Sequence, residues 1–224
     1  MRLRGVIFDF NGVIVDDYPL QKEAWNKISL KLRGIEVTDE EMLQKIRGVQ
    51  TKEIVQWLGN DKISEEELLI IVKEKEETVR DLYLSSPLFR LNKGLDIFLD
   101  DIKKNNTPHT IATSSKFEDL QFSLNKLGLT KWFDINLIIY NDGTYRGKPA
   151  PDAYVLATKK LNLDPKDCVV FEDAVSGITA AYAAGVRYII GVGNDERQTI
   201  LKKLPGVIRG IHDFSKLRVN KIFR

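Results

Sequence analysis

Short runs of apolar, mainly β-branched residues recur along the chain, separated by segments in which apolar residues return every three or four positions. Helical spacing is clear at Leu120, Leu124 and Leu127, and again at Ile178 and Ala181. Because strands that alternate with helices build parallel sheets covered on both faces, the pattern predicts an α/β fold. The runs predicted to be buried strands are 5–8, 110–113, 135–139, 169–171, 188–191 and 207–211.

The segment 17–86 departs from this alternation, because it contains helical spacing and no convincing strand. Ser64 followed by Glu67 three positions later is typical of a capping box that starts a helix. Over 68–82 the apolar positions form one stripe, and the charged residues around it, Lys75 among them, are expected to form a solvated helix face. We therefore expect an inserted helical domain.

Composition excludes several classes of function. Among the 224 residues, 34 are basic and 32 acidic, so no global field would recruit nucleic acid or an anionic membrane. A single cysteine, Cys168, rules out an intramolecular disulfide and a multi-cysteine metal site. Asp9 ends the first apolar stretch too early for a signal peptide or a membrane span. We expect a cytoplasmic monomer whose partner is neither nucleic acid nor membrane.

Acidic residues stand where two predicted strands end, which is where open parallel sheets bind ligands. Asp9 ends the first strand and is followed by Asn11 and Gly12, so it is placed either as a nucleophile or metal ligand or simply as a turn cap. Glu172 and Asp173 end the strand at 169–171. Adjacent buried carboxylates favour a cation, and without histidine or cysteine nearby the hard oxygen ligands point to Mg²⁺.

Two further strand ends carry groups suited to an anion. Thr113, Ser114 and Ser115 precede a helix and could bind phosphate, although such residues are more often ordinary helix caps. Lys148 lies in a loop with two prolines, which could aim its ammonium at a phosphoryl oxygen or a carboxylate. A solvated turn lysine is the alternative.

In this order and spacing, the motifs FDFNGVIVD, ATSSK, GKPAPD and FEDAVSGI resemble the haloacid dehalogenase-like (HAD) superfamily. The resemblance is to its β-phosphoglucomutase and phosphoglycolate phosphatase-like branch and covers nearly the whole chain, with IRGVQTKEIV similar to the substrate loop of that branch's cap. It implies a Rossmann-like three-layer core with a parallel sheet, formed by residues 1–16 and 87–224, and an inserted α-helical cap formed by residues 17–86.

The same resemblance implies a role for each strand-end residue. Asp9 would take the phosphoryl group as an aspartyl phosphate, and Lys148 would neutralise the charge that develops. Thr113, Ser114 and Ser115 would hold the phosphate, and Mg²⁺ would be bound by Asp9, the main-chain carbonyl of Asn11, Glu172 and Asp173.

Residue 11 departs from the family's pattern, which has a second Asp there as general acid and base. The Asn11 side chain exchanges no proton near neutral pH, so help worth roughly 10²- to 10⁴-fold in rate should be missing. In the cap, Gln21 and Thr51 stand where phosphoglucomutases have a histidine and a phosphate-binding arginine. Lys75 matches a cap lysine. Lys52 or Lys75 could replace the arginine, but an exposed helix face explains either lysine equally well.

The sequence thus predicts a Mg²⁺-dependent phosphatase for a small phosphorylated metabolite, slowed by Asn11. A β-phosphoglucomutase-like phosphomutase and a catalytically weak phosphometabolite-binding protein remain the alternatives. Asn11-Gly12 is also a deamidation-prone dipeptide, so an aged preparation would contain some Asp at residue 11.

Overall fold

The computed structural model describes residues 3–222, and within them the strands form one six-stranded sheet whose neighbouring strands are all parallel. The strand order is β3-β2-β1-β4-β5-β6, so the chain crosses over at β1 and β4. Their bounds are Gly5–Phe8 (β1), His109–Lys116 (β2), Ile139–Asn141 (β3), Cys168–Glu172 (β4), Tyr188–Val192 (β5) and Val207–Ile211 (β6).

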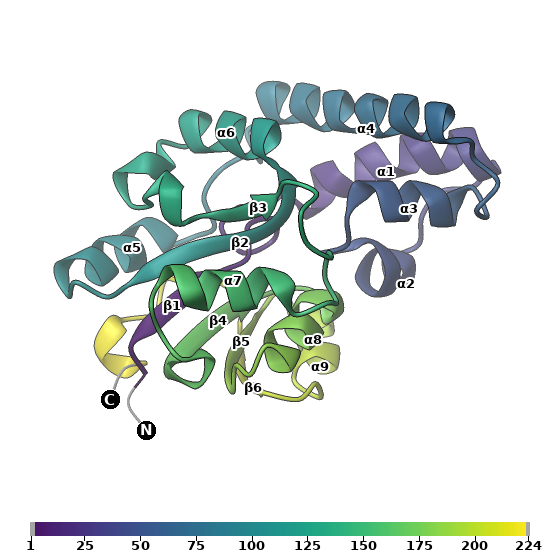
Figure 1. Cartoon of the computed structure of the whole chain (residues 1–224). Coiled ribbons are helices and arrows are strands. Elements are labelled where there is room, and N and C mark those ends of the chain that lie inside the picture. Colours follow the sequence, from purple (N-terminus) through teal and green to yellow (C-terminus); the bar gives the residue numbers. More distant parts are fainter. Residues whose placement is uncertain (1–2, 223–224) are drawn as a thin grey trace.

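Helices cover both faces of this sheet (Figure 1). Side chains alternate along β1, so Phe8 packs with Phe98 and Leu124 on one face, and Ile7 packs with Tyr154 and Ile178 on the other. The expected three-layer α/β core is therefore confirmed. The helices are α5 (Leu95–Lys104) and α6 (Phe117–Lys126) on the first face, and α7 (Asp152–Lys160), α8 (Val175–Ala183) and α9 (Asp195–Leu201) on the second.

Most of the predicted strands are confirmed, but the third is misplaced. Residues 135–137 form a 3₁₀ turn, and the strand begins only at Ile139. The Asp134 side chain accepts a hydrogen bond from the Asn136 amide and so closes the chain into a tight turn, which splits the apolar run. In addition, β2 runs on to Lys116, so Ser114 and Ser115 belong to the strand itself.

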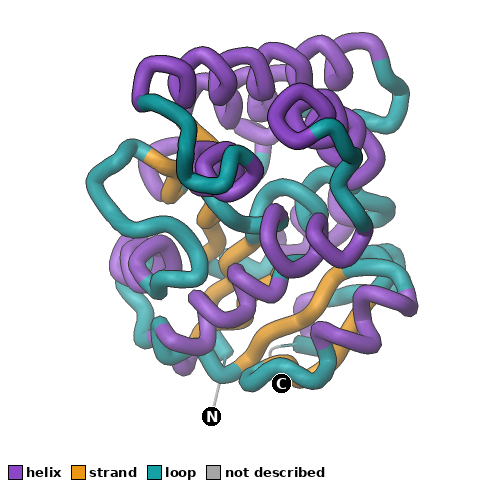
Figure 2. The backbone as a smooth tube through the Cα atoms, turned by 90° about the vertical axis from the view of Figure 1, so that its right-hand side faces the viewer, coloured by secondary structure: helices purple, strands orange, loops and turns teal. Residues whose placement is uncertain are grey.

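The helices of the insertion lie together at one end of the sheet, as Figures 1 and 2 show. They have a core of their own, in which Trp25, Ile54 and Leu68 pack together. The Glu67 amide donates to the Ser64 hydroxyl at the expected start of the last helix. The bounds are α1 (Tyr18–Arg33), α2 (Asp39–Glu41), a π-helical turn (Met42–Ile46), α3 (Thr51–Leu58) and α4 (Glu65–Ser85).

One expectation about α4 is wrong, because Lys75 does not lie on a solvated face. Only 5% of Lys75 is exposed, and its ammonium donates to Gln21 Oε1 at 3.2 Å and lies 4.9 Å from the centre of the Trp25 ring. Lys73 and Glu77 on the same helix are exposed as expected. Within the charged run, Lys75 therefore points toward α1 and is buried.

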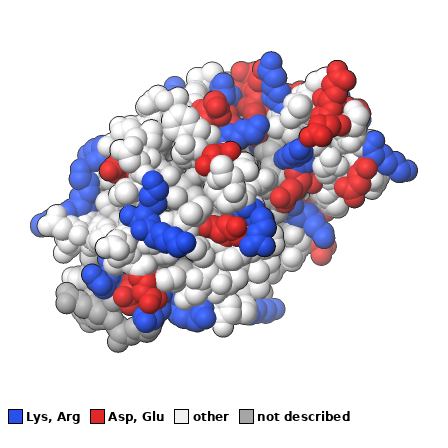
Figure 3. Space-filling view, in the orientation of Figure 1, with Lys and Arg blue, Asp and Glu red and all other residues white. Residues whose placement is uncertain are grey.

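No helix in the described part of the chain combines the length and the apolar character needed to cross a bilayer. On the face shown in Figure 3, acidic and basic side chains are interspersed over the core and the insertion. Surface charge on that face does not indicate a site. Buried charged residues at the carboxyl ends of β1 and β4 do.

Candidate active site

A buried lysine joins two buried carboxylates at the ends of β1 and β4. Lys148 Nζ lies 2.5 Å from Asp9 Oδ1 and 2.7 Å from Glu172 Oε1, and none of the three residues is more than 5% exposed. The Asp9 amide donates to the Phe171 carbonyl at 3.0 Å, which holds the two strand ends together. The loop lysine is therefore buried against the predicted nucleophile, and the solvated-lysine alternative is wrong.

Burial and oppositely charged neighbours shift the pKa values of Asp9 and Lys148 in opposite directions. Burial, and less strongly the Glu172 carboxylate, raises the pKa of Asp9 to about 7 against the attraction of Lys148. Burial would lower the pKa of Lys148, but the two carboxylates outweigh it and raise that pKa well above its ordinary value. Lys148 is thus a fixed positive charge at neutral pH.

The Glu172 carboxylate accepts four hydrogen bonds. Its Oε1 accepts from Lys148 and from the Tyr154 hydroxyl at 2.9 Å, and its Oε2 accepts from the amides of Asp173 and Ala174 at 2.7 and 2.9 Å. The carboxyl group lies against Gly177, where any side chain would collide with it. Four hydrogen bonds use the acceptor positions of a carboxylate, so Glu172 is built to hold Lys148 in place.

Asp173 completes an acidic cluster with Asp9 and Glu172, in which one carboxylate oxygen from each lies within 4.8 Å of the others. Asp173 Oδ2 is buried and accepts no hydrogen bond from residues 3–222, and it forms ion pairs with Arg47 and, at 3.5 Å, with Arg197. Carboxylate oxygens clustered in this way are the hard donors that Mg²⁺ prefers. The residues present therefore fit this ion.

The predicted phosphate-binding hydroxyls lie beside this cluster. Thr113 Oγ1 donates to Ser115 Oγ at 3.2 Å and accepts from the Ser115 amide at 3.1 Å. Ser115 Oγ in turn donates to Asn11 Oδ1 at 3.2 Å. The Ser114 hydroxyl turns the other way and donates to the Gly48 carbonyl of the insertion at 2.7 Å. Ser114 is therefore a contact between the two parts of the chain.

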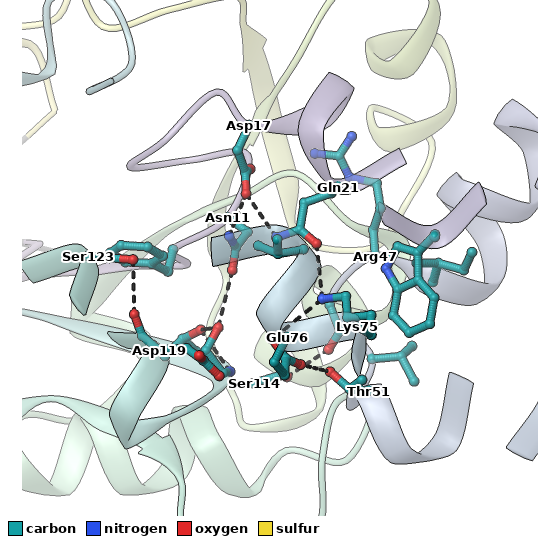
Figure 4. Close-up of a pocket in the computed structure, with 18 of the residues that line it drawn as sticks. Asn11, Asp17, Gln21, Arg47, Thr51, Lys75, Glu76, Ser114, Asp119 and Ser123 are labelled. Atoms are coloured by element: carbon teal, nitrogen blue, oxygen red, sulfur yellow. Dashed lines mark hydrogen bonds and ion pairs between the residues drawn. The ribbon is translucent and has the colours of Figure 1, made fainter. Parts of the chain in front are cut away.

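A cavity joins these groups to the insertion, and Figure 4 shows many of the side chains that line it. Gln21, Thr51 and Lys75, all predicted to contact substrate, line this cavity. Thr51 donates to Glu76 Oε1 at 2.6 Å. Lys52, the fourth predicted residue, is exposed, pairs with Glu65 at 3.0 Å and does not line the cavity. Lys52 thus has the exposed position of an ordinary helix-face lysine, and its role as a substrate ligand stays a prediction.

Several groups in the cavity have no strong signal in the sequence. Arg47 belongs to IRGVQTKEIV, but nothing in that motif separates it from neighbouring positions. Its carbonyl accepts from Ser176 at 2.7 Å, which fixes the insertion against α8. Asp17 is 1% exposed and, with Tyr83, contacts the Asn11 side chain. Of these three residues, only Asn11 belongs to one of the four motifs.

Comparisons with known proteins show which family this chain resembles over most of its length. The haloacid dehalogenase-like hydrolase family matches residues 6–191. A phosphorylated carbohydrates phosphatase of Thermotoga maritima is 32% identical over 190 residues, which cover 85% of this chain and 85% of that protein. A crystal structure of a HAD hydrolase, family IA, variant 3, from Entamoeba histolytica superposes with a TM-score of 0.87 at 35% identity and covers 99% of this chain and 98% of that one.

A third similar protein carries a different activity in its name. The crystal structure of a β-phosphoglucomutase from Clostridium difficile superposes with a TM-score of 0.80 at 29% identity, covering 98% of this chain and 95% of that one. Phosphatases and a phosphomutase are thus both among the chain's relatives.

Proposed function

The chain belongs to the haloacid dehalogenase-like hydrolase family, and we propose that it is a Mg²⁺-dependent phosphatase that forms an aspartyl phosphate at Asp9. The observation that carries this proposal is the placement of Asp9. It stands at the carboxyl end of β1, lines the cavity, and is held by a buried lysine beside Asp173. A carboxylate in that position can attack a phosphoryl group that enters the cavity.

In the first half of the reaction, an Asp9 oxygen forms a bond to phosphorus while the bond from phosphorus to the ester oxygen breaks. The Thr113 hydroxyl and the Ser114 amide hold the transferring oxygens, and Lys148 balances their negative charge. Asn11 gives no proton to the departing alkoxide, which must take one from water. In the second half, water attacks phosphorus, the bond to Asp9 breaks, and inorganic phosphate leaves.

We assign the Mg²⁺ ligands to Asp9, the main-chain carbonyl of Asn11 and Asp173. When bound, the ion supplies positive charge that stabilises the phosphoryl oxygens during transfer. Glu172 lies in the same cluster, but its oxygens already accept four hydrogen bonds. We therefore replace its assignment as a direct ligand by the role of holding Lys148 against Asp9.

We infer that the substrate is a small phosphorylated metabolite and, more narrowly, a phosphorylated sugar. The name of the Thermotoga relative supports a carbohydrate. In the cavity, Gln21, Thr51, Lys75 and Glu76 offer donors and acceptors that suit sugar hydroxyls. Trp25 adds an apolar surface beside them.

A phosphomutase is the second candidate, favoured by the similarity to a β-phosphoglucomutase and by the buried Lys75. A mutase must also bind a second phosphate, and Thr51 carries no charge and donates to Glu76. The third candidate, a phosphometabolite-binding protein with weak catalysis, is favoured by Asn11. Both alternatives keep the same phosphate site.

The first test is the dependence of rate on the leaving group. An aryl phosphate needs little proton assistance to depart, whereas a sugar phosphate needs a general acid that Asn11 cannot supply. At saturation with Mg²⁺ present, we expect p-nitrophenyl phosphate to form the aspartyl phosphate faster than glucose 6-phosphate, by roughly 10²-fold in single-turnover phosphorylation. Equal rates for the two substrates would show that another group protonates the leaving oxygen.

We propose further that residues 17–86 act as a cap that moves against a core formed by 1–16 and 87–224. Residues 1, 2, 223 and 224 of these ranges lie outside the described residues. Hydrogen bonds from Ser114 and Ser176 to carbonyls of the insertion, with the Arg47–Asp173 ion pair, would hold the cap closed over the site. Closure would exclude water during phosphoryl transfer.

Small-angle X-ray scattering measures this movement. Mg²⁺ with beryllofluoride, which mimics a phosphoryl group on Asp9, should lower the radius of gyration relative to the ligand-free protein, because the occupied site draws the cap onto the core. A scattering profile that stays unchanged, while calorimetry shows saturation with beryllofluoride, would contradict a mobile cap.

A further inference from the structure

Asp17, a buried carboxylate outside the acidic cluster, lies against Asn11 at the start of the insertion. Asp17 Oδ2 accepts from Asn11 Nδ2 at 2.6 Å, from Gln21 Nε2 at 3.1 Å and from the Tyr83 hydroxyl, and Asp17 Oδ1 accepts from the Gly12 amide at 3.1 Å. Four donors therefore converge on a side chain that is 1% exposed. An ionised carboxylate, which only accepts, satisfies all of them.

This arrangement leaves the Asn11 amide only one favourable orientation. Its NH₂ group faces Asp17 and also lies 3.1 Å from the Tyr83 hydroxyl, and its Oδ1 accepts from Ser115 on the other side. Rotating the amide by 180° would place its oxygen against the Asp17 carboxylate, and two acceptors would then face each other without a proton. The amide oxygen is therefore kept on the side of the phosphate-binding hydroxyls.

The same hydrogen bonds continue into the insertion, as Figure 4 shows. Gln21 donates to Tyr83 at 2.6 Å and accepts from Lys75 at 3.2 Å. Burial, reinforced by the Asp17 charge, raises the pKa of Tyr83 well above its ordinary value, so its hydroxyl remains a donor at neutral pH. A continuous set of contacts thus runs from Ser115 in the core to Lys75 on α4.

We propose that Asp17 is a positioning residue that fixes the Asn11 amide with its oxygen toward the phosphate site. In that orientation Asn11 can accept a hydrogen bond from the water that attacks the aspartyl phosphate, but it cannot protonate the leaving group. Asp17 therefore acts on the second half of the reaction through Asn11. This kinetic consequence rests on the proposed function, whereas the orientation of the amide does not.

Exchange of the two side chains tests the proposal. In Asp17→Asn, an NH₂ group replaces one carboxylate oxygen and faces either the Asn11 NH₂ group or the Gly12 amide. Either placement brings two buried donors together, and the Asn11 amide loses the charged acceptor that fixes its orientation.

In the double variant Asn11→Asp/Asp17→Asn, the new carboxylate at 11 accepts from the new amide at 17. The Tyr83 hydroxyl, which lies 3.1 Å from Asn11 Nδ2, can turn to donate to that carboxylate while it still accepts from Gln21, so most donors regain an acceptor. Asp16→Asn is the matched control, because Asp16 is the adjacent carboxylate and is exposed.

Thermal unfolding gives a readout that needs no catalysis. We expect Asp17→Asn to lower the melting temperature by roughly 3 to 8 °C through mismatched buried hydrogen bonds. The double variant should recover most of that loss, and Asp16→Asn should change little. The proposed pairing of residues 11 and 17 would be overturned if the double variant lost as much melting temperature as the two single variants lose together. If Asp17→Asn fails to fold, a folded double variant supports the pairing. A double variant that also fails to fold contradicts the pairing.

Rapid-quench kinetics with p-nitrophenyl phosphate and Mg²⁺ give the second readout. Asp17→Asn should form the aspartyl phosphate within about twofold of the wild-type rate but hydrolyse it roughly tenfold more slowly. Hydrolysis at the wild-type rate, or equal slowing of both steps, would overturn the proposal. Absence of phosphoprotein in every variant would count against the proposed function, while the unfolding cycle would still decide how residue 11 is held.

Discussion

Asp9→Asn is expected to lower steady-state hydrolysis of p-nitrophenyl phosphate on the order of 10⁴-fold or more, because the variant lacks the nucleophile that would form the aspartyl phosphate. The amide has nearly the shape of the carboxyl group, so the cavity should be preserved. The measurement is turnover at saturating substrate and Mg²⁺, with circular dichroism to show that the variant is folded.

The substitution also removes one of two carboxylates beside Lys148, which leaves Glu172 to balance the lysine at 2.7 Å. Some loss of stability is therefore expected and should be separated from loss of chemistry. Asp16→Asn, which neutralises an exposed carboxylate seven positions along the chain, should retain wild-type turnover. Activity of folded Asp9→Asn within tenfold of wild type would show that Asp9 is not the nucleophile.

Asn11→Asp is expected to raise steady-state hydrolysis of an alkyl phosphate by about 10²-fold or more, because it supplies a carboxyl group able to protonate the leaving oxygen and activate water. The structure strengthens this expectation. The new carboxyl group would lie at hydrogen-bond distance from Asp17, where Asn11 Nδ2 now lies at 2.6 Å. Two carboxyl groups so close share one proton, so a proton is at hand for the leaving group.

The assay needs protein in which residue 11 is verified to be Asn and not its deamidation product. The Gly12 amide, which would attack the Asn11 side chain during deamidation, donates to the Val15 carbonyl at 2.7 Å and to Asp17 at 3.1 Å. These hydrogen bonds oppose the deamidation to which the dipeptide is prone, and intact mass with peptide mapping should show a largely unmodified Asn11. If that material hydrolyses alkyl phosphates as fast as Asn11→Asp, another residue is the acid and base.

The strand ends could be predicted from the sequence because parallel strands carry their carboxyl ends to one edge. Asp9 directly follows β1 and Asp173 directly follows β4, so the two carboxylates meet although they are distant in sequence. The apolar run at 135–139 shows the limit of this reasoning. One side chain, Asp134, closes a turn there, and composition alone does not reveal it.

The contacts between the insertion and the core could not be predicted in the same way. Asp16 and Asp17 are adjacent and chemically identical, and only the direction in which α1 leaves the core turns Asp17 inward. Lys75 and Lys52 both stand on charged helices, but Lys75 faces α1 and Lys52 faces solvent. Such choices depend on how the helices pack against each other, and the periodicity of one helix does not determine that.

The most direct test of the proposed mechanism is a rapid-quench time course with p-nitrophenyl phosphate and Mg²⁺ on protein verified as Asn11. If Asp9 accepts the phosphoryl group and nothing activates water efficiently, we expect a burst of nearly one p-nitrophenol per protein molecule, followed by slow turnover. Acid-quenched protein should then carry a hydroxylamine-sensitive phosphate that maps to Asp9. A linear time course with no phosphate on Asp9 would contradict an aspartyl phosphate intermediate at Asp9.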